Sequence, residues 1–187
     1  MLRAFLAIDL PASLRPPLAR VQEELRKSSA DVRWVPVGNI HLTLKFFGQI
    51  PDTEVELITQ AAGKIAGGQA PFTLEITQAG AFPSVKSPRV VWLGIGGDLP
   101  VMEQFQRKLE GAFAELGHLP EDRAFAPHLT LGRVRSSKGR QELSRRLTEL
   151  PPLAGDPFQV SEIILFRSTL SPQGATYLPL KVIPLGA

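Results

Sequence analysis

The chain has 187 residues, of which 43% are hydrophobic and 21% are charged, a composition that allows one substantial core or two small lobes. It contains no cysteine, which excludes disulfides, thiolate zinc sites and a cysteine nucleophile. The three histidines, His41, His118 and His128, form no close-spaced metal-binding motif, so we expect no metal ion and no cofactor. The formal net charge of +3 fits an anionic partner without requiring one.

Membrane attachment is not expected. No apolar run approaches the roughly 20 residues that a membrane-spanning helix needs. Near the N-terminus, Asp9 and Pro11 interrupt the apolar stretch after about six residues, which is shorter than the hydrophobic region of a secretory signal. We therefore expect a cytoplasmic protein.

The first half of the chain alternates between strand-like and helix-like segments. The opening segment is apolar and is followed by Pro11, which is typical of a buried strand. Apolar residues from Leu14 to Leu25 then recur at three- and four-residue steps, which predicts a helix with one apolar face. We predict strands at Leu2–Asp9, Ile40–Phe47 and Phe72–Ala81 and helices at Ser13–Lys27 and Asp52–Ala66.

The second half repeats this alternation. Met102, Phe105 and Leu109 recur on one helical face, and segments rich in proline, glycine and serine separate the elements as loops. We predict strands at Arg89–Ile95, His128–Val134, Phe158–Phe166 and Thr176–Ile183, helices at Leu99–Leu116 and Lys138–Leu150, and loops at Phe82–Pro88, Gly117–Pro127 and Ser168–Gly174.

The two halves also share sequence landmarks. The tetrapeptide HLTL occurs at His41–Leu44 and again, 87 residues later, at His128–Leu131. FLAIDLP at Phe5–Pro11 parallels WLGIGGDLP at Trp92–Pro100 at the same offset. Matched landmarks in one order indicate a duplicated pair of structural units, because the period is too long for a solenoid.

We therefore predict a single α+β domain over residues 1–187 with a bilobal, duplicated fold. The repeat halves cover about residues 1–84 and 89–187. Each would form a sheet-and-helix lobe, and a pseudo-twofold axis would relate the lobes around a central groove. The order of the strands does not follow from the sequence.

Side-chain alternation gives each HLTL segment one polar face. In a strand, His41 and Thr43 point to one side, and His128 and Thr130 do the same in the second copy. The leucines between them supply the buried side, so the polar faces must meet water or a ligand. A single copy of this pattern is usually structural, whereas two identical copies in equivalent positions indicate function.

Two histidines that face one groove suit phosphodiester chemistry. Imidazole has an unperturbed pKa of about 6.5, so its neutral and charged forms coexist near neutrality. The neutral ring can take a proton from the attacking oxygen while the charged ring protonates the leaving oxygen, each worth roughly 10²–10⁴-fold. Hydroxyl groups of Thr43 and Thr130 can donate to the non-bridging phosphate oxygens, where charge builds in the transition state. This scheme needs no nucleophilic side chain, metal ion or cofactor.

At these residues the sequence resembles the 2H phosphoesterase family, named for its pair of HxT motifs. Within that family it is most similar to the RNA 2′,3′-cyclic phosphodiesterases, also called 2′-5′ RNA ligases. The resemblance covers nearly the whole chain, including FLAIDLP, RWVPVGNIHLTLKFFGQIP at Arg33–Pro51 and FAPHLTLGRV at Phe125–Val134. It implies a bilobal fold with a central groove and metal-independent opening of a 2′,3′-cyclic phosphate to a 2′-phosphate end. It also implies the reverse joining of a 5′-hydroxyl through a 2′-5′ linkage.

The resemblance further implies a role for each motif residue. His41 would protonate the departing 3′ oxygen, His128 would activate water, and Thr43 and Thr130 would hold the phosphate oxygens. The sequence alone does not fix which histidine takes which role, because the two halves are nearly symmetric. RNA with a cyclic phosphate end, tRNA halves included, is then the expected partner of a monomeric enzyme.

Several residues near the motifs are secondary candidates. Arg133, which the family pattern also carries, could clamp a phosphate, but strict alternation puts it on the leucine face unless a bulge redirects it. Lys45 and Phe47 share the His41 face, where Lys45 faces the groove or solvent and Phe47 stacks a base or joins the core. His118 lies in a loop and is expected at the surface. Three residues could track an RNA backbone or form an exposed helix start: Arg135, Lys138 and Arg140.

Two alternatives to an RNA-end phosphodiesterase stay open. The same chemistry could act on a small cyclic nucleotide or a similar cyclic phosphate, with only the pocket differing. The groove could also bind an RNA end or a nucleotide without turnover, although both histidines and both threonines are present. A purely structural role leaves the repeated polar face unexplained.

Overall fold

The computed structural model describes residues 1–153 and 156–186. These residues form an α+β fold, which confirms the predicted class. The helices are α1 (Arg15–Arg26), α2 (Glu54–Gly67), α3 (Leu99–Ala114) and α4 (Arg140–Glu149), with short 3-10 turns η1 (Ala12–Leu14) and η2 (Val37–Asn39). The strands are β1 (Leu2–Asp9), β2 (Val32–Trp34), β3 (His41–Ile50), β4 (Phe72–Pro83), β5 (Pro88–Gly97), β6 (His128–Val134), β7 (Phe158–Val160), β8 (Glu162–Ser171) and β9 (Gly174–Pro184).

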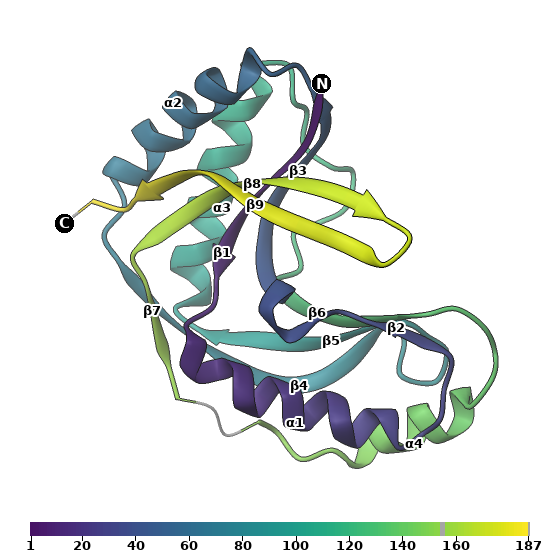
Figure 1. Ribbon diagram of the computed structural model, residues 1–187. Coiled ribbons are helices and arrows are strands. Elements are labelled where there is room, and N and C mark those ends of the chain that lie inside the picture. Colours follow the sequence, from purple (N-terminus) through teal and green to yellow (C-terminus); the bar gives the residue numbers. More distant parts are fainter. Residues whose placement is uncertain (154–155, 187) are drawn as a thin grey trace.

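The strands pair antiparallel in the order β7-β4-β5-β6-β3-β1-β8-β9, and β2 pairs with β6 off this path. The central β3–β6 pairing consists of one residue pair, Leu42 with Leu129. This narrow joint divides the sheet into two parts. We call β1, β3, β8 and β9 with α2 and α3 the β3 lobe, and β2, β4, β5, β6 and β7 with α1 and α4 the β6 lobe (Figure 1).

Each lobe takes elements from both sequence halves. Helix α1 follows β1 in the chain but lies along the β6 lobe beside α4, and α3 follows β5 but lies beside α2 (Figure 1). The last strands, β8 and β9, extend the sheet next to β1. The lobes are therefore intertwined, and the joint between β3 and β6 depends on both halves of the chain.

Apolar helix faces cover the sheet. Phe105, Leu109 and Phe113 of α3 are buried, as are Leu18 and Leu25 of α1. Full burial of a side chain of this size contributes about 1.5–3 kcal/mol relative to exposure. The motif histidines lie on the other face of the sheet, because side chains alternate along a strand and the motif leucines are buried.

A β-bulge interrupts each HLTL segment at the same position. In the β1–β3 pairing, Thr43 and Lys45 have partners and Leu44 is skipped. In the β5–β6 pairing, Thr130 and Gly132 have partners and Leu131 is skipped. Because a bulge adds one residue to one strand, the side chains after it point to the face opposite to the one that strict alternation predicts.

A buried glutamine supports each bulge. Nε2 of Gln22, on α1, donates to the carbonyl oxygens of Val35 and Leu131 at 2.8 and 3.0 Å. Nε2 of Gln106, on α3, donates to the carbonyl oxygen of Leu44 at 3.2 Å. A bulged carbonyl loses its place in the ladder and needs a donor elsewhere. The two lobes solve this in the same way, as a pseudo-twofold relation requires.

The C-terminal strands differ from the prediction in their extent. The segment Phe158–Phe166, predicted as one strand, is divided at Ser161 into β7 and β8. The predicted loop Ser168–Gly174 is mostly strand, because β8 and β9 stay paired as far as Ser171 with Gly174. Polar residues favoured a loop here, but cross-strand pairing in a long hairpin overrides that local preference.

Candidate functional site

The two HLTL segments meet at the joint between the lobes. The leucines of both motifs are almost completely buried. They anchor β3 and β6 in the main core, so the motif histidines and threonines occupy the opposite face of the sheet. The motif residues of the two lobes therefore share one face at the centre of the molecule.

The register of the joint brings these residues close together. Continued by one residue in each direction, the register of the Leu42–Leu129 pair would set His41 opposite Thr130 and Thr43 opposite His128. The two histidines are thus diagonal neighbours on one face, an arrangement in which Cα atoms lie about 7–8 Å apart. Two imidazoles at this spacing can reach a single phosphate group.

A backbone carbonyl two residues earlier in the chain orients each histidine ring. Nδ1 of His41 lies 2.7 Å from the carbonyl oxygen of Asn39, and Nδ1 of His128 lies 2.7 Å from the carbonyl oxygen of Ala126. A carbonyl oxygen only accepts, so Nδ1 carries the proton in both rings. In the neutral form Nε2 then has a free lone pair and can accept a proton, and in the charged form it can donate one.

Aromatic rings enclose His41. Phe5 stacks on the imidazole with ring centroids 4.6 Å apart, and Tyr177 meets it edge-on at 5.2 Å. Desolvation by this burial lowers the pKa of His41, while the carbonyl of Asn39 and the carboxylate of Asp9 act in the opposite direction. The neutral imidazole is therefore favoured when no ligand is bound.

His128 has a different and more open surrounding. The ring of Phe82 meets its imidazole edge-on at 5.0 Å, and Phe82 in turn contacts Trp92. The indole of Trp92 lies flat over Gly80, where an added Cβ would come within 2.3 Å of it. Glycine at that position therefore lets the aromatic layer beneath His128 form.

One cavity joins motif residues of both lobes. Its volume is about 1010 Å³, and Thr43 of the first motif and His128 of the second line it together with Arg133. The remaining walls come from α3, the segment before β6 and the β4–β5 hairpin. The position of this cavity, at the joint, makes it the candidate active site.

The bulge at Leu131 directs Arg133 to the groove face. Arg133 pairs with Val90 in β5 and with Arg33 in β2, so the two guanidinium groups start from directly opposite positions. Neither arginine takes part in an ion pair within the described residues. Like charges directly opposite one another destabilise a sheet unless an anion compensates them. Arg33 was not a candidate from the sequence. The feature that could have indicated it is its position at the start of the segment Arg33–Pro51, which carries the first HLTL motif.

Tyr177, on β9, meets the His41 imidazole edge-on and also contacts the ring of Phe5. Burial raises the pKa of its hydroxyl, and the guanidinium groups of Arg133 and Arg3 counter this by lowering it. Tyr177 was not a candidate from the sequence, because only the β8–β9 hairpin brings it to His41.

Lys45, Phe47 and His118 lie on the helix side of the sheet, not on the His41 face. Lys45 is only 5% exposed and donates to Glu110 Oε2 at 2.8 Å, so it is not solvated, as one predicted alternative had it. It does line the cavity that contains Thr43 and His128, but it reaches that cavity from the helix side of the sheet. Phe47 packs against Phe113, in line with its predicted alternative as a core residue. His118 bonds Glu54 through Nε2 at 3.0 Å and is largely covered, so it is not a surface residue. The bulge at Leu44 explains the positions of Lys45 and Phe47, because it reverses the alternation that follows it.

The bulge brings Phe46 to the groove instead. Phe46 pairs with Phe5, is 39% exposed and lines the cavity. The guanidinium group of Arg3 lies 4.4 Å from its ring centroid. By contrast, three basic residues after Arg133 do not line this cavity: Arg135, Lys138 and Arg140. Arg135 is instead paired with Asp31.

Within the described residues, no group of three or more histidine, aspartate and glutamate side chains is arranged to hold a metal ion. A search of the same residues finds no helix with the length and apolarity to cross a bilayer.

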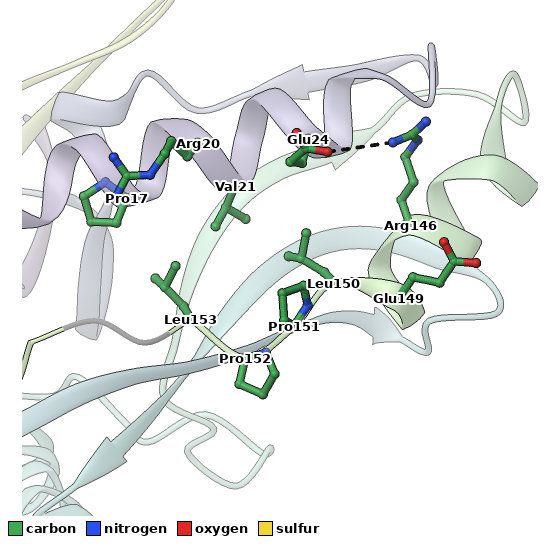
Figure 2. Close-up of a pocket in the computed structure, with 10 residues that line it drawn as sticks. All are labelled: Pro17, Arg20, Val21, Glu24, Arg146, Glu149, Leu150, Pro151, Pro152 and Leu153. Carbon is green, nitrogen blue, oxygen red and sulfur yellow. Dashed lines mark ion pairs between the residues drawn. The ribbon is translucent and has the colours of Figure 1, made fainter.

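A smaller cavity of about 470 Å³ lies between α1 and the end of α4 (Figure 2). Figure 2 shows Val21 and Leu153 on its apolar walls and Glu24 facing Arg146 at its rim. It contains no motif residue and lies outside the groove. Its charged side chains largely neutralise one another, so it is not a candidate for binding an anion.

Comparisons with known proteins show the family of the chain. The model of the family described as LigT like phosphoesterase matches residues 8–92 and 99–177. The chain is 38% identical to an RNA 2′,3′-cyclic phosphodiesterase of Methanothermobacter thermautotrophicus, over 98% of both chains. It is 32% identical to an RNA 2′,3′-cyclic phosphodiesterase of Escherichia coli, over 96% of this chain and 94% of the relative. The structure of E. coli LigT complexed with 3′-AMP superposes with a TM-score of 0.80 at 30% identity, covering 100% of this chain and 99% of that one.

Proposed function

Because the chain belongs to the LigT-like phosphoesterase family, we propose that it is an RNA 2′,3′-cyclic phosphodiesterase that opens the cyclic phosphate to a 2′-phosphate end. The observation that carries this proposal is the meeting of the two HLTL segments at the joint, where Thr43 and His128 line one cavity. Two relatives at 38% and 32% identity carry the same activity in their names. The 3′-AMP complex of E. coli LigT supports a nucleotide-sized ligand.

The two histidines act as the acid–base pair. His128 Nε2 takes the proton of the attacking water, and His41 Nε2 gives a proton to the departing 3′ oxygen. The bond from phosphorus to the new oxygen forms while the bond to the 3′ oxygen breaks. Proton transfer of this kind is worth roughly 10²–10⁴-fold for each group. The proton on Nδ1 stays in place throughout, because a backbone carbonyl holds it in each ring.

The surroundings of His41 constrain this assignment. An acid must be protonated when the substrate is bound, whereas burial lowers the pKa of the free His41. The cyclic phosphate carries a negative charge, and a nearby anion raises the pKa of an imidazole. Substrate binding would therefore favour the protonated form of His41, which is the form that acts as the acid. Asp9, which lies opposite His41 in the β1–β3 pairing, assists in the same direction.

Three further side chains hold the phosphate. The hydroxyl groups of Thr43 and Thr130 donate to its non-bridging oxygens, as the shared face of the motifs allows. Arg133, turned to the same face by the bulge, adds a charge-assisted contact. The scheme itself requires no metal ion, since charge stabilisation comes from donors of the chain.

The exposed ring of Phe46 suits the base of the terminal nucleotide. Single-stranded RNA is commonly held by stacking of bases on aromatic rings and on guanidinium planes. Phe46 and Arg133 line the same cavity as His128. The same acid and base also serve the reverse reaction, so joining of a 5′-hydroxyl through a 2′-5′ linkage is part of the proposal.

The test is hydrolysis of an RNA that ends in a 2′,3′-cyclic phosphate, in the presence of a chelator. We expect full conversion to 2′-phosphate ends, identified by their resistance to an enzyme that removes only 3′-phosphates. Formation of 3′-phosphate ends would overturn the assignment of the leaving oxygen. No turnover by the folded wild-type protein would overturn the proposed function.

A further inference from the structure

The cavity at the joint extends well beyond the motif residues. Its volume of about 1010 Å³ is at the upper end of the range of about 300–1,000 Å³ that is usual for pockets enclosing one small molecule. Away from Thr43 and His128, its walls are formed by α3, by the segment Pro120–Ala126 and by the β4–β5 hairpin. We call this part the outer arm of the cavity.

Three arginines from three different elements line the outer arm. Arg89 is the second residue of β5, Arg107 lies on α3, and Arg123 lies in the segment before β6. None of them takes part in an ion pair within the described residues. They come from separate parts of the chain, so helical or strand periodicity does not account for their convergence.

The carboxylates of the outer arm do not balance this charge. Glu110 accepts a hydrogen bond from Lys45 at 2.8 Å and another from Gln106 at 3.1 Å, so Lys45 already compensates its charge. Glu121 is the other acidic residue that lines the cavity. Three guanidinium groups and the single further carboxylate of Glu121 leave a net positive charge, which attracts an anion with several oxygens.

We propose that the outer arm is a second phosphate subsite, which binds the phosphodiester linkage preceding the terminal nucleotide of the substrate. The proposal rests on the proposed function, because it concerns the same substrate in the same cavity. A cyclic phosphate at the joint and a diester in the outer arm together require at least a dinucleotide. The enzyme is then selective for oligonucleotide ends over cyclic mononucleotides.

Lys108 provides a matched control. It follows Arg107 on α3 and is exposed, but it is not among the residues that line the cavity. Removing its charge changes the net charge of the protein by the same amount as removing that of Arg107. Any effect that is specific to Arg107 is therefore due to position rather than to overall charge.

The experiment measures kcat/KM for a dinucleotide with a 2′,3′-cyclic phosphate end and for the corresponding cyclic mononucleotide. Wild-type protein should prefer the dinucleotide by about tenfold or more, the effect of one charge-assisted contact. This ratio should fall by about tenfold in the Arg107→Ala/Arg123→Ala double variant, and Lys108→Ala should keep the wild-type ratio. The salt dependence of log KM for the dinucleotide should also become shallower by about 0.7, the value for one phosphate on a single strand.

The outcomes separate this inference from the proposed function. If wild-type protein hydrolyses both substrates with equal kcat/KM, or if the double variant keeps the preference, the second subsite does not exist while the phosphodiesterase stands. If wild-type protein hydrolyses neither substrate, the proposed function itself fails. Thermal unfolding midpoints of the variants should match that of the wild type, because all the substituted side chains are exposed.

Discussion

Replacement of Gln22 by leucine tests whether the bulge at Leu131 depends on its buried glutamine. The substitution keeps the approximate volume but removes the donors to the carbonyl oxygens of Val35 and Leu131. The Leu131 oxygen keeps a second donor, the backbone N–H of Val35 at 2.8 Å. The Val35 oxygen is therefore the acceptor that loses its partner.

The expected cost follows from that single acceptor. Leaving a buried acceptor unpaired costs about 1–3 kcal/mol, and because Val35 is only half-buried we expect about 1–2 kcal/mol. For a chain of this length, each kcal/mol lowers the unfolding midpoint by about 2–4 °C. The Gln22→Leu protein should thus melt roughly 2–8 °C below the wild type, by circular dichroism or calorimetry.

The control is Gln104→Leu, on the exposed face of α3. A surface substitution of this kind should change the free energy of unfolding by less than about 0.5 kcal/mol. Gln22→Leu should also lower kcat/KM, because the bulge that it supports directs Arg133 to the groove. Equal melting temperatures for the two variants would show that the hydrogen bonds from Gln22 to Val35 and Leu131 do not stabilise the fold, and an unchanged kcat/KM would show that the bulge does not depend on Gln22.

Three further predictions concern the groove. Because burial lowers the pKa of His41 in the folded protein, the unfolded chain binds more protons as the pH falls through about 6.5, and stability is lost on acidification. In urea unfolding, the wild type should therefore lose stability relative to His41→Asn between about pH 8 and pH 5. A stability difference that does not change with pH would contradict the burial argument. Arg133→Ala should lower kcat/KM for cyclic-ended RNA by about tenfold. Arg135→Ala, which removes a side chain paired with Asp31, should leave kcat/KM unchanged. Equal losses in the two variants would show that Arg133 makes no specific contact with the phosphate. Phe46→Ala should raise KM by about tenfold, since stacking contributes about 1–3 kcal/mol per base, and Phe46→Trp should restore binding; an unchanged KM in the alanine variant would mean that no base stacks there.

The overall design could be predicted because it depends on local pattern and repetition. Apolar periodicity located the helices and most strands, and the repeated HLTL segments identified the α+β duplication. The exchange of α1 and α3 between the lobes could not be predicted, since it depends on long-range packing. The same holds for the β8–β9 hairpin, which brings Tyr177 to His41.

The limits of the site prediction come from the bulges. Strict alternation placed Lys45 on the face of His41 and Arg133 on the face of the leucines, and one extra residue at Leu44 and at Leu131 moves each to the opposite face. The same shift exchanges the positions expected for Phe46 and Phe47. A bulge leaves no clear local signal in the sequence, although the arginine of the family pattern at Arg133 could reach the groove only if a bulge redirected it.

The central claim is that two histidines from the two lobes act on one phosphorus, and single and double substitutions test it most directly. Turnover of cyclic-ended RNA should fall by about 10²-fold or more in His41→Ala and in His128→Ala. The double variant should be little worse than either single variant, because groups that act as a unit are not additive. Near-normal turnover in either folded single variant would contradict the account.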